Sequence, residues 1–414
     1  MTPAHRVRPA RQRVSIVAST LAGALAIAGG GWLYAMSHLD RAAAEGTFLE
    51  AVPHLRLTTT PPDGATDVRP DLLVNATAQY GVISRGELAV DGGAPMTGTI
   101  ATDGSSWSSA GTTLAPAARY HVTLSLDTPR GPVQRRFSFS TLKPTRVLGA
   151  ELSPDDGDTV GVGQPVAVHF DSAVKDRAAV ERRLQVQTAP GVAGAWHWFG
   201  DREVHYRPST YWPAGAQVTV AANLSGVDAG GGVWGEHNLT VHFAVGDAHV
   251  SVVDVQQHTM TVTSNGNTVK VYPQSAGSMK YPTMAGVHVV LSKQADIIMD
   301  SATNGIPRDS PDGYYEHVFW DVRISNGGEF VHAAPWSVGA QGRDNVSHGC
   351  VNLSPENAIE FFGFSRRGDV VRVAGSDRPP EPDAGTQDWN MSWAEWLAGS
   401  ALASAPGATP VPGT

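Results

Sequence analysis

Hydrophobic and polar positions alternate over short stretches along most of the chain. Stretches such as 136–141 alternate apolar with polar side chains, and turn-forming Gly, Asp and Pro residues separate one stretch from the next. The pattern occurs in two copies that begin with similar short sequences, PPDG at 61–64 and SPDDG at 153–157. Alternating strands spaced in this way over about 100 residues are typical of immunoglobulin-like sandwiches. We therefore predict two such domains, at 56–145 and 146–246, which act as spacers.

Strand patterns continue beyond residue 246. Two stretches, 260–262 and 268–271, alternate across Asn265-Gly266, a pair that favours the positive φ angles of a type I′ hairpin turn. Further strands are predicted at 286–291, 319–324, 329–333 and 370–373. The pattern predicts a third, β-rich domain at 247–375.

One helix and one long loop interrupt these strands. Ser354 is a candidate N-cap and Pro355 suits the first helical position. The apolar face of this helix is predicted to consist of Ala358, Ile359, Phe361 and Phe362. Residues 300–317 are rich in Gly, Pro and Asp, which predicts a loop long enough to act as a lid. The predicted fold class is mainly β: two immunoglobulin-like β-sandwiches, then a β-rich domain whose short helix follows Cys350.

The amino terminus has the pattern of an exported protein. Residues 1–13 carry four arginines and no acid, and 14–36 form an uncharged, Ala- and Gly-rich apolar run. We predict that this run is a single membrane anchor rather than a cleaved signal, although the sequence leaves both open. With the arginines in the cytoplasm, everything after the run lies outside, beginning with a linker at 37–55.

The carboxyl-terminal tail, 376–414, carries three tryptophans. Trp389, Trp393 and Trp396 are spaced by four and three residues, which predicts one helical face. We expect this face to pack on the third domain; the alternative is an aromatic surface for sugar or lipid. The Ala-, Gly- and Pro-rich end of the tail is predicted to be disordered.

Composition and charge narrow the functional classes. Hydrophobic residues make up 41% and charged residues 17%, with 45 Gly and 28 Pro, which excludes a disordered chain and a helical one. The net charge is −9, and without the four cytoplasmic arginines 26 basic residues stand against 39 acidic ones, a balance of −13. Nucleic acid is a poor partner for such a surface.

The chain has a single cysteine, Cys350. It can form no intrachain disulfide and no four-cysteine zinc site. An unpaired thiol in an exported protein is unusual, which favours a reactive cysteine over a buried, inert one. Its surroundings, Ser347-His348-Gly349-Cys350-Val351-Asn352, place backbone N–H groups near the thiol, a condition that can favour a thiolate and bind an oxyanion.

A nucleophilic cysteine also needs a base, because a free thiol titrates near about 8.5. Two histidines are candidates. His348 lies two residues before Cys350, and His332 ends a predicted strand that could run alongside it. The residues alone leave both open. A zinc site formed by these two histidines is disfavoured because no third ligand has suitable spacing.

These residues resemble a known family. His332, fourteen intervening residues and the motif SHGCVN, together with FVHAAPWSVGAQG at 330–342, are similar to the active-site signature of L,D-transpeptidases with a YkuD-type catalytic domain. The resemblance extends over the whole chain to the actinobacterial members, which share a membrane segment, two immunoglobulin-like domains, the catalytic domain and a tryptophan-bearing tail. It implies that 247–375 is the catalytic domain.

The resemblance also implies roles for the motif residues. Cys350 would be the nucleophile and His332 its general base, with the imidazole oriented by the carbonyl of Ala333. His348 would organise the site or contact substrate. Asn352 would support the loop by hydrogen bonding.

Further residues follow from the same resemblance. The N–H groups of Gly349 and Cys350 would form an oxyanion hole, helped by the lid tyrosine Tyr314. The donor pocket would be lined by Met299, Trp336 and Ser347. The chain departs from the family pattern twice, with Gly327 in place of a serine and Asn304 in place of a lid tyrosine.

The activity implied is that of a peptidoglycan transpeptidase in the cell envelope. A tetrapeptide stem would acylate Cys350 with release of D-alanine, and the diaminopimelate amine of a second stem would take up the acyl group in a 3→3 cross-link. Carbapenems are implied as covalent inhibitors, and no metal or cofactor is needed. The alternatives are an L,D-carboxypeptidase, in which water replaces the acceptor amine, and a non-catalytic wall-binding protein whose immunoglobulin-like domains do the binding.

Overall fold

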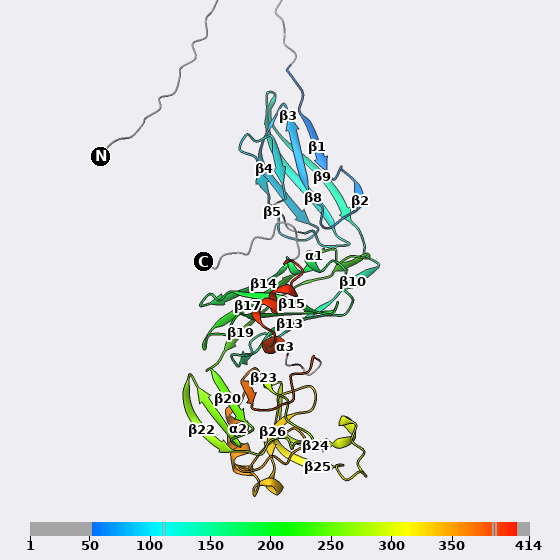
Figure 1. Cartoon of the computed structure of the whole chain (residues 1–414). Helices are drawn as coiled ribbons and strands as arrows, with labels where there is room; N and C mark the ends of the chain where they lie inside the picture. The colour runs from blue at the N-terminus through cyan, green and yellow to red at the C-terminus, as the bar shows by residue number, and fades with distance from the viewer. Residues whose placement is uncertain (1–51, 110, 112, 383–384, 386, 404–414) are drawn as a thin grey trace, which may run out of the picture. The chain divides into compact units, whose positions relative to one another are not determined.

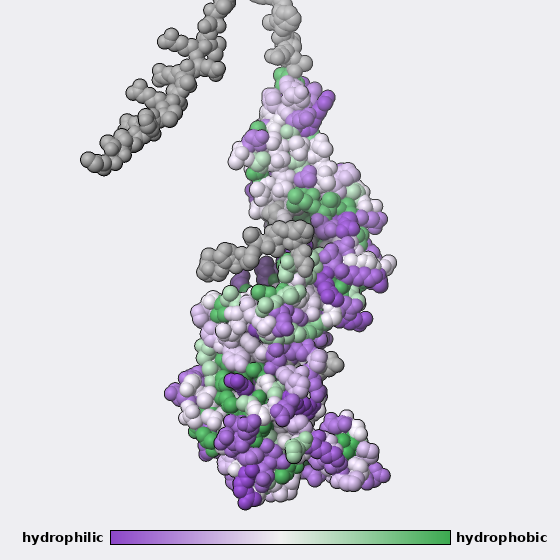
Figure 2. Space-filling model, in the orientation of Figure 1, coloured by the Kyte–Doolittle hydropathy of each residue, from purple (hydrophilic) through white to green (hydrophobic). Residues whose placement is uncertain are grey.

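A computed structural model describes residues 52–109, 111, 113–382, 385 and 387–403. The predicted basic tail and apolar run, 1–36, lie outside these residues, as do most of the linker and the end of the tail. Among the residues described, no helix is both long and apolar enough to cross a membrane. On the face in Figure 2, apolar residues lie in small patches among polar ones.

Two sheets pack into the first sandwich (Figure 1). Their strand orders are β1 (Arg56–Thr60), β3 (Asn75–Gln79), β7 (Ser106–Ser108), β6 (Thr99–Ile100), and β2 (Ala65–Val68), β9 (Gly131–Thr141), β8 (Arg119–Thr128), β4 (Val82–Val90), β5 (Met96–Thr97). Burial alternates along β8, where Tyr120, Val122, Leu124 and Leu126 face the core. The period of two is that of a half-buried strand, as the sequence predicts.

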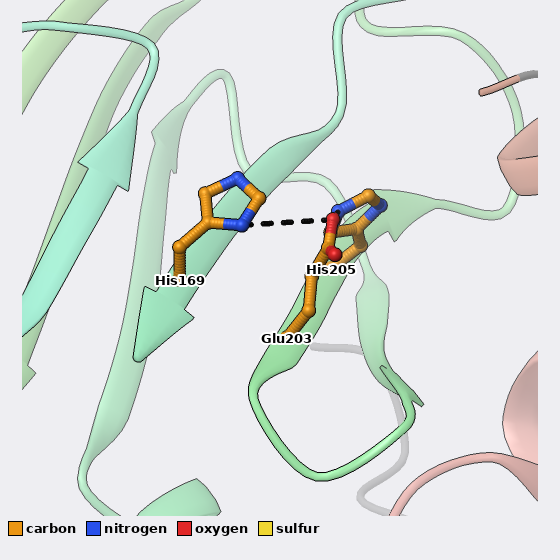
Figure 3. Close-up of side chains that lie close together, drawn as sticks. All are labelled: His169, Glu203 and His205. Carbon is orange, nitrogen blue, oxygen red and sulfur yellow. Dashed lines mark hydrogen bonds and ion pairs between the residues drawn. The ribbon is translucent and has the colours of Figure 1, made fainter. Parts of the chain in front are cut away.

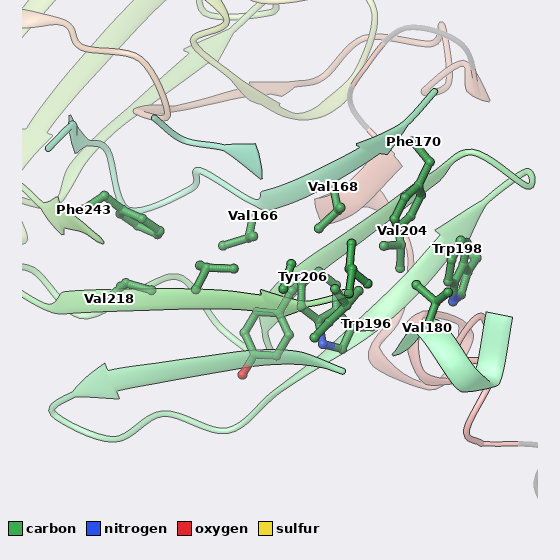
Figure 4. Close-up of a cluster of buried hydrophobic side chains, with 14 of the residues drawn as sticks. Val166, Val168, Phe170, Val180, Trp196, Trp198, Val204, Tyr206, Val218 and Phe243 are labelled. Atoms are coloured by element: carbon green, nitrogen blue, oxygen red, sulfur yellow. The ribbon is translucent and has the colours of Figure 1, made fainter. Parts of the chain in front are cut away.

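The second sandwich repeats this plan. Its sheets have the orders β11 (Ala150–Ser153), β13 (Val166–Phe170), β16 (Glu203–Pro208), β15 (Gly194–Phe199), and β12 (Thr159–Val160), β19 (Asn238–Val245), β17 (Gln217–Asn223), β14 (Leu184–Ala189). A two-stranded ribbon, β10 (Arg146–Leu148) with β18 (Val233–Gly235), and helix α1 (Arg177–Glu181) complete it. Val166, Val168 and Phe170 of β13 point into a core shared with Trp196, Trp198 and Phe243 (Figure 4).

The third β-rich region is formed by two further sheets. Their orders are β22 (Asn267–Pro273), β21 (Thr259–Ser264), β20 (His249–Asp254), β28 (Val370–Ala374), β23 (Gly286–Val289), and β24 (Ser292–Asp300), β25 (Tyr315–Arg323), β26 (Phe330–Ala333), β27 (Val351–Leu353). The mainly β fold class is thus confirmed, while the domain limits given above stay predictions. The predicted hairpin is confirmed, since Asn265 (φ 49°) and Gly266 (φ 81°) both have the positive φ of a type I′ turn.

The helix after Cys350 is α2 (Pro355–Phe364), and it begins as predicted. The Ser354 hydroxyl accepts the N–H of Asn357, and Pro355 occupies the first turn. Ala358 and Phe361 are buried against the second sheet, but Ile359 is exposed, so the apolar face is narrower than predicted. The predicted lid is a loop between β24 and β25 that contains the short helix η1 (Ser301–Asn304).

The carboxyl-terminal tail does not form the single helix that the tryptophan spacing predicts. It forms two short helices, α3 (Gln387–Asn390) and α4 (Trp393–Ala398), because Ser392 and Glu395 form a capping box that starts a new helix. Trp389, Trp393 and Trp396 surround one guanidinium, that of Arg207 in β16, at 4.8, 5.2 and 4.5 Å from their ring centroids. The indoles therefore pack on the second sandwich, rather than on the third domain as expected.

Candidate active site

A parallel strand pair brings the motif histidine and cysteine to one cavity. β26 and β27 pair so that His332 lies opposite Asn352, two residues after Cys350. The cavity has a volume of about 310 Å³. Eight of the ten predicted site residues line it: Met299, Tyr314, His332, Trp336, Ser347, His348, Cys350 and Asn352. The other two, Ala333 and Gly349, are their direct neighbours in the chain.

His332 is held as a neutral imidazole. Its ring is buried, and Nδ1–H donates a hydrogen bond to the carbonyl oxygen of Ala333 at 3.0 Å. Because a carbonyl only accepts, this bond assigns the proton to Nδ1 and leaves the lone pair on Nε2. Burial lowers the pKa of His332 to about 4, although Ala333 and Asn352 act in the opposite direction. The ring is therefore a free base at neutral pH.

Cys350 is held as a neutral thiol. Its Sγ lies 3.8 Å from the carbonyl oxygen of Gly328, to which it donates. Burial raises the pKa of Cys350 to about 12; the negative charges of Glu329 and Asp321 add to this rise, and the Phe330 N–H opposes it. The motif therefore does not stabilise a resting thiolate, contrary to the expectation from nearby N–H groups. A thiolate would form here only if a base removed the proton.

The motif loop is closed by the hydroxyl of Ser347. Its Oγ donates to the carbonyl oxygen of Cys350 at 2.6 Å and accepts the N–H of Gly349 at 3.1 Å. Gly349 has a φ of 128°, a conformation that a residue with a Cβ rarely adopts. The bond to Ser347 uses the Gly349 N–H, one of the two donors expected for an oxyanion.

His348 lies between two tyrosines. Its ring is 4.7 Å from that of Tyr281 and 5.1 Å from that of Tyr314, centroid to centroid. The exposed imidazole thus links the motif to the lid through Tyr314. Its ring lies tilted against both tyrosine rings, and it is a separate group from the buried imidazole of His332.

Asn352 fixes the end of the motif. Its backbone exchanges two hydrogen bonds with Ser275, at 2.9 and 3.1 Å, and its Nδ2 donates to the hydroxyl of Ser337 at 3.1 Å. Ser337 in turn belongs to the short helix η2 (Pro335–Ser337), which also carries Trp336. The ring of Trp336 is 6.1 Å from that of His332. These contacts hold the wall of the cavity beside the imidazole.

The lid is tied back through Ser301 and Tyr314. The Ser301 N–H donates to the carbonyl oxygen of Tyr314, and the Ser301 hydroxyl accepts the Tyr314 N–H, both at 3.0 Å. Burial raises the pKa of Tyr314, and the negative charge of a Cys350 thiolate would add to this rise. The phenol is therefore a neutral hydrogen-bond donor beside the thiol.

The two residues that depart from the expected family pattern, Asn304 and Gly327, do not line the cavity that holds Cys350. Asn304 lines a neighbouring cavity of about 260 Å³ together with Gly328 and Met299. A Cβ built on Gly327 would have only the Ser325 hydroxyl within 4 Å, at 3.6 Å. The site therefore has room for the serine that Gly327 replaces.

Three nearby residues were missed by sequence reasoning. The ring of Tyr281 lies tilted against that of His348. Glu329 is buried, and it accepts from the Met284 N–H at 2.8 Å and from Arg378 at 3.1 Å. Asp321 is fully buried, and neither of its oxygens has a hydrogen-bond partner from another described residue. Burial, followed by the charge of Asp296, raises the pKa of Asp321 to about 7. Acidic residues on strands carry no local signal of such burial.

A β-rich domain that holds a neutral imidazole and a thiol in one cavity has the two groups that nucleophilic cysteine chemistry requires. Comparison with known proteins gives the family. The bacterial Ig domain matches residues 65–228, and the L,D-transpeptidase catalytic domain matches residues 248–373. L,D-transpeptidase 2 of Mycobacterium tuberculosis (strain CDC 1551 / Oshkosh) is 41% identical over 349 residues, 84% of this chain and 85% of that protein.

The comparison found further similar proteins. L,D-transpeptidase 5 of Mycobacterium tuberculosis (strain ATCC 25618 / H37Rv) is 35% identical over 379 residues, 87% of this chain and 80% of that protein. A solved complex of the L,D-transpeptidase LdtMt1 with imipenem is 39% identical, covers 56% of this chain and 100% of its own, and has a TM-score of 0.49.

The chain belongs to the L,D-transpeptidase family. It is an enzyme, a peptidoglycan L,D-transpeptidase, so it acts on the cell wall outside the cytoplasm. The family, the enzyme class and the fold class given by the sequence are confirmed.

Proposed function

We propose that Cys350 and His332 carry the peptidoglycan L,D-transpeptidation, with Cys350 as nucleophile and His332 as general base. One observation carries this assignment: the Nδ1–H bond to Ala333 leaves the Nε2 lone pair of a buried, neutral imidazole in the cavity that also holds the thiol. A neutral thiol and a neutral base form the ground state from which one proton transfer gives a thiolate.

The reaction has two balanced half-steps. Nε2 of His332 takes the Sγ proton as Sγ bonds to the donor carbonyl, at the L-centre of meso-diaminopimelate in a tetrapeptide stem. The peptide C–N bond breaks, and the proton passes from His332 to the departing D-alanine amine. In the second half-step, the side-chain amine of another stem attacks the thioester and loses a proton to His332. The C–S bond breaks, the proton passes from His332 to the departing Sγ, and the Cys350 thiol is regenerated with release of a 3→3 cross-link.

The oxyanion of each tetrahedral intermediate needs donors. The Gly349 N–H is bonded to Ser347, so the Cys350 N–H is assigned as the backbone donor. The hydroxyl of Tyr314 is assigned as the second donor because it is neutral and lies beside the thiol.

The remaining predicted residues are assigned to the walls of the donor cavity. Met299, Trp336 and Ser347 line it, and His348 joins the lid tyrosine to the motif. Asn352 positions the loop and Ala333 orients the base. No metal or organic cofactor takes part in these steps.

We further propose carbapenems as covalent inhibitors and the apolar run at 14–36 as a single membrane anchor. A strained β-lactam carbonyl would acylate Cys350 as the donor peptide does, and LdtMt1 has been solved with imipenem. The anchor would hold the enzyme on the outer side of the membrane, with the two immunoglobulin-like domains as spacers.

The test uses the purified full chain and a disaccharide-tetrapeptide. Mass spectrometry is expected to find cross-linked dimer and released D-alanine, while Cys350→Ala and His332→Gln are expected to abolish both. His237→Gln, an exposed histidine of the second sandwich, is the matched control and should keep full activity. Tripeptide without dimer would show that water, not an amine, accepts the acyl group. An active Cys350→Ala variant would refute the assignment.

A further inference from the structure

The outer face of the second sandwich carries two histidines and a glutamate in neighbouring register. β13 and β16 are antiparallel, and His169 lies directly opposite Glu203. His205 follows Glu203 by two residues, so it projects from the same face of β16. The three side chains come together on the side of the sheet away from the apolar core (Figure 3).

Their donor atoms are close enough to share one ion. Glu203 Oε1 lies 3.7 Å from Nδ1 of His169 and 2.7 Å from Nε2 of His205. One donor atom from each residue lies within 4.8 Å of the others. Ligand atoms of a tetrahedral zinc site are about 3.3 Å apart, because each bond is about 2.0–2.1 Å long. Small side-chain rotations would bring the three atoms to that spacing and leave one position for water.

A second carboxylate fixes the orientation of His205. Asp388 of α3 is buried, and its Oδ1 lies 2.7 Å from Nδ1 of His205. The ring of Phe199 packs against the same imidazole at 4.8 Å between centroids. A carboxylate on the far nitrogen of a histidine is the usual support of a metal-bound imidazole, since it directs the lone pair of the other nitrogen to the metal.

We propose that His169, Glu203 and His205 bind one zinc ion through Nδ1, Oε1 and Nε2, with Asp388 orienting His205. Two imidazoles and one carboxylate suit zinc better than magnesium or calcium, which prefer oxygen ligands. The site is separate from the chemistry, because it lines a different cavity, of about 690 Å³, which does not include Cys350. It is independent of the proposed function.

The ion would act as a structural clamp for the tail. Asp388 reaches the site from α3, and Asn390 at the end of the same helix bonds both the N–H and the carbonyl of Val287 in β23, each at 2.8 Å. Fixing His205 therefore fixes the helix that contacts both the second sandwich and the catalytic domain.

A proton competes for the same position. Without metal, His205 contacts a carboxylate at each nitrogen; burial opposes its protonation, but Asp388 and Glu203 outweigh burial and raise the pKa of His205 to about 9. Zinc would replace the proton on Nε2. A purely protonated cluster, with no metal affinity, is the rival that the experiment must separate from the clamp.

The experiment titrates the chelator-treated full chain with zinc against a chromophoric chelator. All proteins carry Cys350→Ser, so that the thiol takes no metal. We expect one zinc per chain with a Kd of about 1 μM or tighter. His169→Gln should weaken binding at least about tenfold, and Asp388→Asn by about 10–100-fold with the stoichiometry kept. His242→Gln, an exposed histidine paired with Asp156 in the same domain, is the matched control and should bind as the parent does.

Cobalt provides a second readout that does not depend on stability. The parent should give the intense visible bands of a four-coordinate ion, and His169→Gln should lose them; because His169 is half exposed, this variant is expected to fold. Zinc binding that is absent, or unchanged by His169→Gln, would overturn the proposal. So would the weak bands of a six-coordinate surface ion.

Discussion

At the residue scale, burial shifts the pKa values of the two side chains proposed to react in opposite directions. It raises the pKa of Cys350 to about 12 and lowers that of His332 to about 4. Both shifts favour the uncharged form, so the resting pair is a thiol and an imidazole. The thiol therefore stays protonated until a substrate carbonyl enters the cavity. The Nε2 lone pair of His332 is then available to accept its proton.

The first prediction concerns the acid limb of the activity. Free His332 is protonated, and so lost as a base, only when the pH falls to its lowered pKa. As the pH falls, kcat/KM should therefore decline with a midpoint of about 4 rather than near the ordinary histidine value of about 6.5. Initial rates of carbapenem acylation across this range would measure it. A midpoint near the ordinary value would mean that His332 is solvated in the free enzyme.

The same shift makes a stability prediction. The pKa of His332 is about 4 in the folded chain and about 6.5 in the unfolded chain. Below pH about 6.5, the unfolded chain therefore binds more protons than the folded chain. Stability from neutral His332 is thus complete above the unfolded pKa and is lost as the pH falls toward 4, by up to about 3 kcal/mol. Urea unfolding across this range should show the loss, and His332→Gln should flatten it. An equally steep loss in the variant would assign it to other groups.

A third prediction concerns Gly349. Its φ of 128° is strained for any residue with a Cβ, so Gly349→Ala should destabilise the chain by about 1–3 kcal/mol and displace Cys350. Acylation should fall by at least tenfold in a stopped-flow assay. Gly363→Ala is the control: it lies in α2, with nothing within 4 Å of an added Cβ, and should leave acylation unchanged. Equal acylation by both variants would contradict the expected strain.

How far the sequence predicts the site is clear from these residues. The motif predicted that Cys350 and His332 act together. The structure brings them to one cavity because β26, which holds His332, pairs in parallel with β27, which begins directly after Cys350; eight predicted residues line this cavity. The motif could not predict the charge state of the thiol. That state depends on burial and on Glu329 and Asp321, which fold against it from elsewhere in the chain.

At the element scale, turn and cap residues predicted the secondary structure correctly where the packing of the chain favours the same structure. The Asn265-Gly266 turn and the Ser354-Pro355 start of α2 are determined by backbone preferences within a few residues. β24 was missed because most of its side chains are exposed and do not alternate. The tail was misread because the tryptophan spacing suggested one helix, although Ser392 and Glu395 carry the signature of a new helix start.

The tail supplies the fourth prediction, through Arg207. This residue is buried under three indoles, and its guanidinium also donates to the Met391 carbonyl at 3.1 Å. Arg207→Met should remove these contacts, lower stability by at least about 2 kcal/mol and shift tryptophan emission to longer wavelength. Arg85→Met, which loses only an exposed pair with Glu87, should change stability by less than about 1 kcal/mol. Unchanged emission in Arg207→Met would mean that the tail stays docked without the cation.

At the scale of the whole molecule, strand register creates neighbours that the linear sequence does not reveal. His169 meets Glu203 only because β13 and β16 pair antiparallel in one particular register. The Glu203-Val204-His205 alternation hints that two of the three ligands share a face, but nothing local adds the third or brings Asp388 from the tail. For the same reason, contacts between the second sandwich and the catalytic domain could not be predicted from the sequence.

The last prediction tests those contacts at Gly161. Its N–H bonds the Arg367 carbonyl at 2.7 Å, and a Cβ on Gly161 would lie 2.2 Å from the backbone nitrogen of Asp369. Alanine is compatible with the local backbone, so the strain of Gly161→Ala falls on the contact between the second sandwich and the catalytic domain. We expect one shared calorimetric transition for these two domains in the parent chain and two separate transitions in Gly161→Ala, with carbapenem acylation of Cys350 retained. Gly191→Ala, with nothing within 4 Å of its added Cβ, should keep the shared transition. Separate transitions already in the parent chain, or an unsplit transition in Gly161→Ala, would refute the contact as a determinant of cooperative unfolding.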